Sequence, residues 1–371
     1  MADYYSNSYG GRKRRKKLSL DGKSLAMMLL DAFVTLAMLL LIFCTITAII
    51  CQYITPEKSG ILSVIALGAP VIYLLDIVVM FYWIVRWRWY RATAMIVVVL
   101  VGFFYASRYY KLDIDRQYEV TYKERRFTKI LSYNLCDGRA EGLPEYIRKH
   151  NPDILCIQEM NTVCDNWAIL SEGYQNTASK LEDMGNYILT KHRIIRCGEI
   201  KGLSLRNGMW ADLKIKDDTV RVVNLHLQST SIRPEDTQFL EKHEYILDRD
   251  REVKLRSIVD RLVDNNCKRA VQAQQVADFL KLSPYTTVVC GDFNDVPLSY
   301  TYNLISHNLE DAFSRCTEGF AYTYNTRYGL LRIDNILLSP WVEIVSYEVD
   351  TEVDYSDHYP VISRVKFNQN R

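Results

Sequence analysis

Residues 286–294 have the sequence Thr286-Thr287-Val288-Val289-Cys290-Gly291-Asp292-Phe293-Asn294. The apolar run before the glycine predicts a buried strand that ends at residue 290. Gly291 follows the run, and then come a carboxylate and a carboxamide, Asp292 and Asn294, which serve either as turn residues or as metal-binding and proton-transfer groups. Side chains that carry chemistry commonly lie on loops at one end of a rigid sheet. The segment therefore predicts a central strand whose end contributes to a functional site.

The same arrangement recurs elsewhere between residues 127 and 367. Metal-binding or proton-transfer side chains stand at or beside five further apolar runs: Asn134, Glu159, His226, Asp334, and the pair Asp357 and His358. Each alone is typical of an ordinary turn. A buried carboxylate is unfavourable unless it is paired, so Asp334, between apolar residues, predicts a histidine partner that it would orient. The joint occurrence of six such sites favours one composite active site.

The pattern around these residues predicts a mixed α/β domain. Short apolar runs bounded by turn residues predict strands at 129–134, 153–159, 187–190, 209–215, 220–226, 286–290, 333–338 and 361–365. Apolar residues at helical spacing predict helices at 142–150 and 257–280. Because many strands follow one another directly, we expect sheets packed face to face with helices outside. About 240 residues can bury a single substantial core.

Six segments carry a resemblance to a known family. In chain order they are Ser132-Tyr133-Asn134, Asp153-Ile154-Leu155-Cys156-Ile157-Gln158-Glu159, Val223-Asn224-Leu225-His226, Gly291-Asp292-Phe293-Asn294-Asp295, Arg332-Ile333-Asp334-Asn335-Ile336-Leu337 and Ser356-Asp357-His358-Tyr359-Pro360-Val361. The chain resembles the endonuclease/exonuclease/phosphatase superfamily, which includes pancreatic deoxyribonuclease, apurinic-site endonucleases, inositol-polyphosphate phosphatases and neutral sphingomyelinases. The resemblance covers about residues 127–367. It implies a four-layer sandwich of two packed mixed β-sheets flanked by helices, with the site at one edge of the sheets.

The resemblance also implies a chemistry, the hydrolysis of phosphoesters with a divalent metal, Mg²⁺ with Mn²⁺ as an alternative. Such a metal prefers oxygen ligands and takes one or two carboxylates, and the implied metal residues are Glu159, Asn134 and Asp357. Asp292 would be the general base or would orient the attacking water, with Asn294 beside it. His358, held by Asp334, would donate to a phosphate oxygen, and His226 would be a second donor or the acid for the leaving group.

Two departures limit this comparison. Apurinic-site endonucleases usually have a tyrosine between the glutamate and the first histidine motif, and neither Tyr174 nor Tyr187 aligns with it securely. Arg206 and Asn207 stand where family members often have a loop that contacts substrate, and a solvated hairpin is an equally good interpretation.

The first hundred residues have the composition of a membrane anchor. Six consecutive cations, Arg12–Lys17, precede three nearly uncharged segments at about 33–54, 61–85 and 92–107. A spanning helix needs about 20 apolar residues. The third segment is shorter and spans only if the arginines at its ends reach the membrane surface. Asp31 is expected at that surface and Asp76 in a contact between helices.

Loop charges predict an orientation. Residues 1–24 carry seven cations, the loop at 55–60 one, and the loop at 86–91 three. Positive loops remain cytoplasmic, so the N-terminus is expected inside and the catalytic domain outside the cytoplasm, in an inner or plasma membrane. Cations within 108–126, and seven cysteines without CxxC pairs in the large domain, favour the opposite side. The expected organisation is a basic tail (1–24), a transmembrane region (25–107), a juxtamembrane linker (108–126) and a catalytic domain (127–368), as in a membrane-anchored bacterial-type member.

Charge bears on the substrate. The 371 residues carry a net charge of +2, which excludes a generally basic nucleic-acid coat protein. Residues 107–371 hold 35 basic and 39 acidic side chains, which weakens a nuclease interpretation because nucleases need basic grooves. A local cluster, Arg249, Arg251, Lys254 and Arg256, keeps that interpretation open.

The alternatives are therefore a membrane-anchored phosphodiesterase of nuclease type and a lipid or small-molecule phosphoesterase resembling sphingomyelinases or inositol phosphatases. A non-enzymatic interaction domain is disfavoured by the complete polar set. The expected partners are the lipid bilayer and a phosphoester substrate, and no stable protein partner is inferred.

Overall fold

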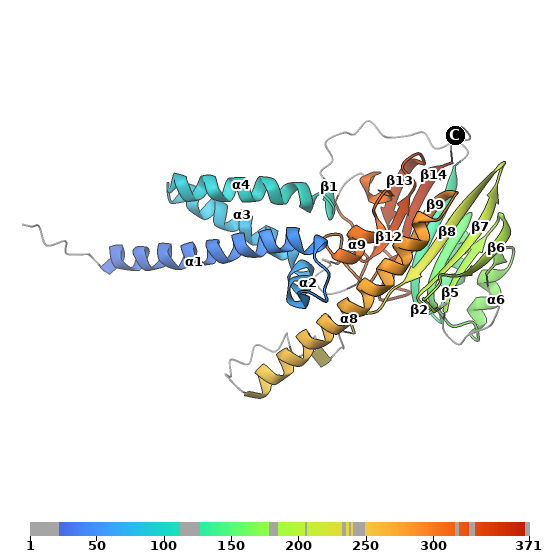
Figure 1. Ribbon diagram of the computed structural model, residues 1–371, viewed down its shortest axis with the longest axis horizontal. Helices are drawn as coiled ribbons and strands as arrows, with labels where there is room; N and C mark the ends of the chain where they lie inside the picture. The colour runs from blue at the N-terminus through green and yellow to red at the C-terminus, as the bar shows by residue number, and fades with distance from the viewer. Residues whose placement is uncertain are drawn as a thin grey trace, which may run out of the picture.

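The computed structural model describes residues 22–111, 127–177, 185–204, 206–231, 235–236, 239, 249–315, 319–325 and 331–367 (Figure 1). Most of the predicted basic tail and linker, and much of the charged segment at 231–248, lie outside the described residues. Three long helices extend from one side of a β-sandwich (Figure 1).

The helices and strands follow the predicted order closely. The helices are α1 (Gly22–Ile50), η1 (Cys51–Tyr53), α2 (Gly60–Leu67), α3 (Ala69–Val85), α4 (Trp89–Ala106), α5 (Leu143–His150), α6 (Asp165–Ser171), α8 (Arg249–Lys281), α9 (Tyr300–Ile305) and η3 (Ala312–Arg315). The strands are β1 (Tyr110–Lys111), β2 (Thr128–Asp137), β3 (Ile154–Met160), β4 (Gln175–Asn176), β5 (Gly185–Thr190), β6 (Arg193–Glu199), β7 (Gly208–Ile215), β8 (Asp218–His226), β9 (Thr286–Asp292), β10 (Glu310–Asp311), β11 (Gly319–Phe320), β12 (Asp334–Leu338), β13 (Glu343–Val349) and β14 (Val361–Lys366).

Two six-stranded mixed sheets form the body of the molecule. One has the strand order β13-β14-β2-β3-β5-β4 and the other β10-β12-β9-β8-β7-β6. β2 pairs with β3 and β8 with β9 in parallel, whereas the other pairs within these sheets are antiparallel. Helices cover both outer faces, so the expected fold class of two packed mixed sheets flanked by helices is confirmed.

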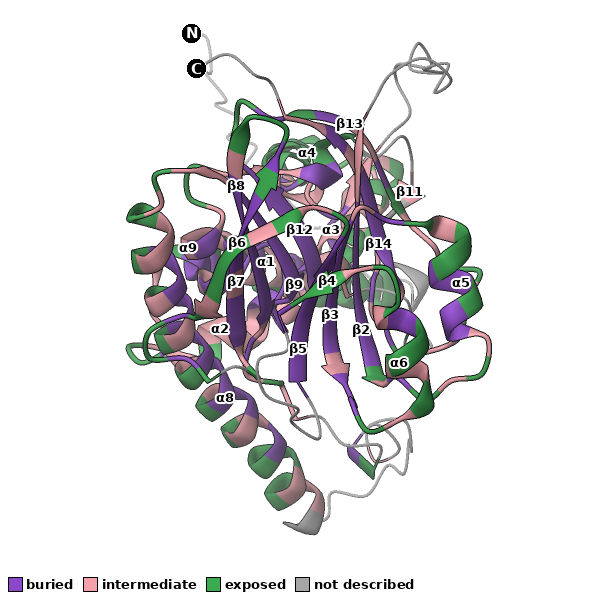
Figure 2. Cartoon of the chain, turned by 90° about the vertical axis from the view of Figure 1, so that its right-hand side faces the viewer, coloured by how far each residue is buried: buried purple, intermediate pink, exposed green. Residues whose placement is uncertain are grey.

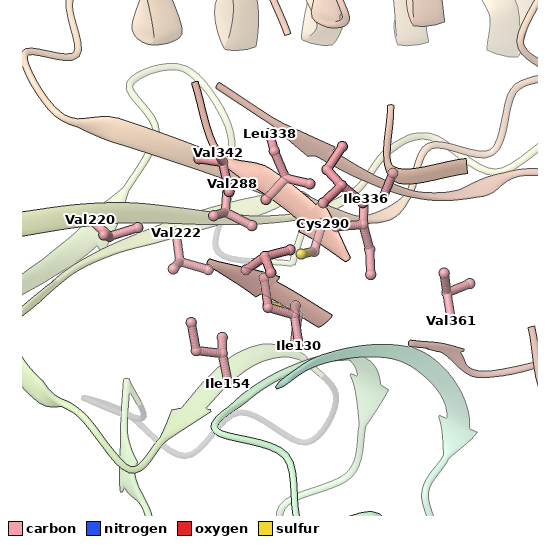
Figure 3. Close-up of a cluster of buried hydrophobic side chains, with 14 of the residues drawn as sticks. Ile130, Ile154, Val220, Val222, Val288, Cys290, Ile336, Leu338, Val342 and Val361 are labelled. Carbon is pink, nitrogen blue, oxygen red and sulfur yellow. The ribbon is translucent and has the colours of Figure 1, made fainter. Parts of the chain in front are cut away.

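Strand periodicity explains how the layers pack. Ile130 and Ile154 face the opposite sheet and meet residues such as Val222 and Val288 there (Figure 3). Their neighbours along the same strands, Leu131 and Leu155 among them, point outward and pack against α5 and α6. The outer face of the second sheet packs in the same way against α8 and α9. Each such side chain is fully buried and contributes about 2 kcal/mol. Figure 2 shows the central strands mostly buried and the edge strands β4 and β6 mostly exposed.

The N-terminal helices have the length and apolarity that a membrane requires. Leu25–Tyr53 and Trp89–Ala106 each qualify as a span, and Gly60–Leu67 with Ala69–Val85 forms a third candidate bent by 66°. The bend falls at Gly68, with Pro70 in the first turn of α3, because proline cannot continue the preceding helix. The predicted second span is therefore not one straight helix: α2 turns aside to pack on α8, and α3 alone runs beside α1 and α4.

The two acidic residues of this region have partners. Asp31 accepts hydrogen bonds from Nε and Nη2 of Arg86, both at 3.0 Å, at the end of the helices remote from the sandwich. Thr45 of α1 donates to Asp76 of α3 at 2.5 Å, so the expected contact between helices at Asp76 is confirmed.

The other end of the helices is joined to the sandwich. Ala48, Cys51 and Ala66 pack with Val296 and Leu298 in one buried cluster. Polar contacts cross the same junction, including Asn266 Nδ2 to Ser63 Oγ at 2.6 Å. The segment on the sandwich side of the junction follows directly after Asp292 and Asn294, so the helices rest against a loop of the candidate site.

Candidate active site

The predicted site residues converge at one edge of the sandwich, where β2 and β3 end (lower edge of Figure 2). In the second sheet, His226 of β8 lies opposite Asp292 of β9, and Asp334 of β12 lies opposite Asp292 on the other side. Three neighbouring strands therefore present their polar residues in one row. In the first sheet, Asn134 lies opposite Gln158, directly before Glu159.

Irregular backbone directs the side chains of the first sheet into the site. The β2–β3 ladder shifts register after Asn134, and the β3–β5 ladder shifts after Ile157. Glu159 itself has φ 52° and Asn294 also has φ 52°, a left-handed conformation that is uncommon for residues other than glycine. Bulges and strained residues of this kind concentrate where a side chain must be re-aimed for function.

Asn134 and His226 connect the two sheets at the site. Asn134 Nδ2 donates to Glu159 Oε1 at 3.1 Å and to Asp292 Oδ2 at 3.2 Å. His226 Nε2 lies 3.2 Å from Glu159 Oε1 and 3.9 Å from Asp292 Oδ2. In this geometry the amide nitrogen of Asn134, rather than its oxygen, faces the carboxylates.

His358 lies between two buried carboxylates. Its Nδ1 is 2.9 Å from Asp334 Oδ2 and its Nε2 is 3.7 Å from Asp292 Oδ2. Burial opposes a charge on the imidazole, but Asp334 and then Asp292 outweigh burial and raise the pKa of His358 to about 10. The ring is therefore an imidazolium at neutral pH, and the contact of its Nδ1 with Asp334 fixes its orientation.

Asp292 is fixed by the turn that follows it. Its Oδ1 accepts from the backbone amide of Asn294 at 2.7 Å, and its Oδ2 from the Asn294 side chain at 3.0 Å. Asn294 also donates to the carbonyl of Leu227 at 3.1 Å, which ties β9 to the end of β8. The pKa of Asp292 is raised above its usual value, because burial outweighs the opposing effect of His358.

Asp357 lies at the solvent-exposed side of the site. Ser356 Oγ donates to the Asn134 carbonyl at 2.7 Å and lies 3.3 Å from Asp357 Oδ1, which ties this loop to β2. Partial removal from water and the charges of Asp357 and Glu159 raise the pKa of the Cys136 thiol to about 11. Cys136 thus lies within the influence of both carboxylates.

Two carboxylates of the site are of the type that a divalent cation takes and are open to solvent. The Glu159 side chain is one-third exposed (33%), and Asp357 is exposed, so each could bind a cation together with water. Asp292, Asp334 and His358 also bring one ligand atom each within 4.8 Å of one another. There, Nδ1 of the imidazole is already engaged by Asp334, which leaves only its Nε2 for another partner.

Two contributors to the site have little sequence signal. The Tyr324 ring lies at an edge-to-face angle to His358, with centroids 5.0 Å apart, and the two backbones form a bridge. Thr323 Oγ1 accepts from the backbone amide of Asp334 at 3.0 Å. An alternating segment, Tyr322-Thr323-Tyr324-Asn325, is the only local signal, and it is too short to predict a strand.

The tyrosines considered for the site lie elsewhere. Tyr187 packs on Trp167, and Tyr174 donates to the carbonyl of Pro152. Asn207 uses its amide to donate to the His226 carbonyl at 3.0 Å, so it supports the end of β8.

A polar layer between the sheets supports the site from below. Asn224 Nδ2 donates to the carbonyls of Ile157 (2.8 Å) and Tyr187 (3.0 Å), and its Oδ1 accepts from Gln158 at 2.6 Å. These buried bonds connect β8 to β3 and β5, the strands beside Glu159. They define the spacing of the two sheets at the site.

Comparison with solved structures finds similar chains at low identity. A humanized D. rerio TDP2 carrying 14 mutations is 17% identical, with 65% of this chain and 99% of that chain covered and a TM-score of 0.46. An AP endonuclease from Archaeoglobus fulgidus is 16% identical (64% and 98% covered, TM-score 0.47). The mannosyl-6-phosphatase Bt3783 of Bacteroides thetaiotaomicron VPI-5482 is also 16% identical (65% and 100% covered, TM-score 0.43). These likenesses concern the fold alone.

Comparison by sequence separates two regions. No curated protein matches the chain. Residues 31–109 match the model of a domain of unknown function, DUF8431, which spans the N-terminal helices. Residues 131–358 match the model of the Endonuclease/Exonuclease/phosphatase family, and this region includes every residue of the site described above. The chain therefore belongs to the endonuclease/exonuclease/phosphatase family.

Proposed function

We propose that the chain is a membrane-anchored phosphoester hydrolase that depends on a divalent metal, Mg²⁺ with Mn²⁺ as an alternative. The observation that carries the proposal is the placement of His358 between Asp334 and Asp292, with Asn134 linking Asp292 to the accessible carboxylate of Glu159. This arrangement would combine a fixed cationic donor with carboxylates that can hold a metal. A phosphoryl group needs both, because its hydrolysis concentrates negative charge on oxygen.

Glu159 and Asp357 would hold the cation. The metal, when bound, would polarise a phosphoryl oxygen. Asn134, which donates to Glu159 and Asp292, would fix the separation and the orientation of these two carboxylates. The amide would offer its oxygen to the metal only if it turned over, so its proposed role is chiefly that of a positioning residue.

The remaining residues would act on substrate and water. His358 would donate its Nε2 proton to a nonbridging phosphate oxygen, since Nδ1 is engaged by Asp334. Asp292, with both oxygens ordered by Asn294, would orient the attacking water as general base. His226, on the opposite side of Asp292 from Asp334, would be a second phosphate donor or would protonate the leaving oxygen.

The substrate has two candidate classes. A phosphodiester of nucleic acid is the first. A phospholipid or small phosphoester is the second, and it is favoured by the junction between the helices and the loop after Asn294, which would keep the site near the membrane surface.

The test uses the full chain purified in detergent. Plasmid DNA, RNA, sphingomyelin, phosphatidylinositol and an aryl phosphate are assayed with Mg²⁺, with Mn²⁺ and with a chelator. We expect turnover of one class with metal and none with chelator. Glu159→Gln and His358→Gln should each lower kcat by about 10²–10³-fold, whereas His192→Gln, a partly buried histidine at the β5–β6 turn, should not change it. Metal-dependent turnover retained in both site variants would refute the proposal.

A further inference from the structure

An apolar cavity of about 340 Å³ lies among the N-terminal helices at their sandwich end. Ile49 of α1, Ile72 of α3, Ala106 of α4 and Leu298 of the sandwich are among the residues that line it. Almost all of its lining is apolar, so a water molecule inside would find few hydrogen-bond partners. The physical chemistry of the cavity therefore favours a hydrocarbon occupant.

A polar recess of about 420 Å³ adjoins this cavity, and Ser107 lines both. The recess is lined by Arg108 and Lys111, which are half-buried. Arg108 donates to the carbonyl of Pro297 at 2.9 Å and to Gln52 Oε1 at 3.3 Å, and Lys111 lies 5.7 Å from the centre of the Phe313 ring.

The charge of the recess is positive and incompletely neutralised. Neither Arg108 nor Lys111 pairs with a carboxylate among the described residues. The one acid of the recess, Asp311, is already engaged by Arg332 and by the Tyr302 hydroxyl. The recess therefore offers two cations to an anion.

The position of both spaces indicates their ligand. Ser107 and Arg108 directly follow the last residue of α4, where a spanning helix would leave the hydrocarbon and meet phosphate headgroups. Basic residues just beyond the end of a membrane helix attract anionic lipid headgroups. The outer faces of the helices are themselves apolar, with Leu36 and Phe104 about 70% exposed (68% and 70%). Lipid would therefore be the medium around the cavity.

We propose that this junction binds one anionic phospholipid, with an acyl chain in the apolar cavity and the phosphate beside Arg108 and Lys111. The inference rests on the membrane anchoring proposed above and is independent of the hydrolytic activity. A bound lipid would also contact residues that are connected to the catalytic loops. Pro297 and Leu298 follow Asn294 in one loop, and Arg332, which donates to the Arg108 carbonyl at 3.0 Å, stands two residues before Asp334.

The test measures lipid retention by the full chain. The protein is incubated with phosphatidylglycerol or phosphatidylcholine of matched acyl chains in detergent, and bound lipid is counted by native mass spectrometry. We expect one phosphatidylglycerol to be retained in preference to phosphatidylcholine. Inorganic phosphate should not displace it, because phosphate alone lacks the acyl chain.

Two variants examine the two halves of the site separately. Ala106→Trp fills the apolar cavity and should abolish retention of both lipids, whereas Val97→Trp, on the exposed face of α4, should not. Lys111→Glu should weaken phosphatidylglycerol binding about tenfold and leave phosphatidylcholine unchanged. The exposed Lys201→Glu is its matched control.

Two results would overturn the inference. One is equal retention of both lipids by the unaltered chain, and the other is retention of phosphatidylglycerol by Lys111→Glu at the unaltered level. Hydrolytic activity is measured on the same samples. Absence of metal-dependent turnover in the unaltered chain, with lipid retention intact, would contradict the proposed function and leave the lipid site standing, so the two failures can be distinguished.

Discussion

The imidazole of His358 is stabilised in its charged form by the same contacts that would make it a phosphate donor. Asp334 is fully buried and accepts from Nδ1, and Asp292 lies 3.7 Å from Nε2. The pKa of about 10 in the folded chain lies above the usual 6.5. The folded state therefore binds a proton that the unfolded state has released across this pH range.

Stability should accordingly depend on pH in a defined direction. The contribution of His358 should be fully present below about pH 6.5 and should be lost as the pH rises toward 10. In Asp334→Asn, which removes the main cause of the raised pKa, the decline between pH 7 and 9 should be shallower. The pH dependence of both chains is measured by thermal unfolding in the presence of a chelator, monitored by intrinsic fluorescence. The exposed Asp218→Asn is the control. Parallel pH profiles for Asp334→Asn and the unaltered chain would contradict this account.

At the scale of elements, the pairing of β8 with β9 leaves no room for a side chain at Gly291, beside the site. Gly291 pairs with Leu225 in the parallel ladder and has φ 127°, and a Cβ there would lie 2.0 Å from the Leu225 carbonyl oxygen. Backbone atoms cannot withdraw as a flexible side chain can. Only glycine therefore permits the pairing that aligns His226 with Asp292.

Gly291→Ala should destabilise the fold by about 3 kcal/mol or more, because positive φ and backbone overlap act together. Gly173→Ala is the matched control, since Gly173 also has positive φ (79°) but a Cβ at that position would meet no neighbouring atom within 4 Å. It should lose only about 1–2 kcal/mol. Chemical denaturation of both variants measures the difference, and equal losses would show that the close approach at Gly291 is unimportant.

At the scale of the whole molecule, the helices and the sandwich share one junction. The loop at 51–59 and the end of α4 lie at the sandwich, while Arg86 and Asp31 lie at the remote end of the helices. Exposed aromatic side chains, Trp87 and Trp89, stand at that remote end, as expected at a membrane surface. If the helices span a membrane, the sandwich lies on the side opposite to the loop at 86–91.

We expect the sandwich to lie outside the cytoplasm. Cys197 is exposed on β6 and provides a native reporter of its side. A membrane-impermeant thiol reagent should label Cys197 in intact cells, and the label should be absent from that position in Cys197→Ser. Labelling of Cys197 only after lysis would place the catalytic domain in the cytoplasm and reverse the predicted orientation.

Much of the fold could be predicted because strand and helix periodicity are local properties. The run before Gly291, and those before Glu159 and His226, form β9, β3 and β8 with ends within a few residues of those expected. Strands such as β6, whose residues are mostly exposed, carry no apolar alternation and could not be predicted. A single span over 61–85 does not account for the bend at Gly68, because hydropathy is continuous across it, although Gly68 and Pro70 are a local signal for a break.

The sequence by itself determined the apolar helices, the order of the strands and the residue types available for phosphoester chemistry, since these depend on composition and local spacing. Only the tertiary structure decided which of these residues meet. Asp292, Asp334 and His358 are separated by tens of residues and are brought together by the pairing of β9 with β12 and by the bridge at Tyr324. The contact of the helices with the loop after Asn294 was decided in the same way. Such contacts depend on how apolar faces pack across the whole chain, and local spacing does not encode that packing.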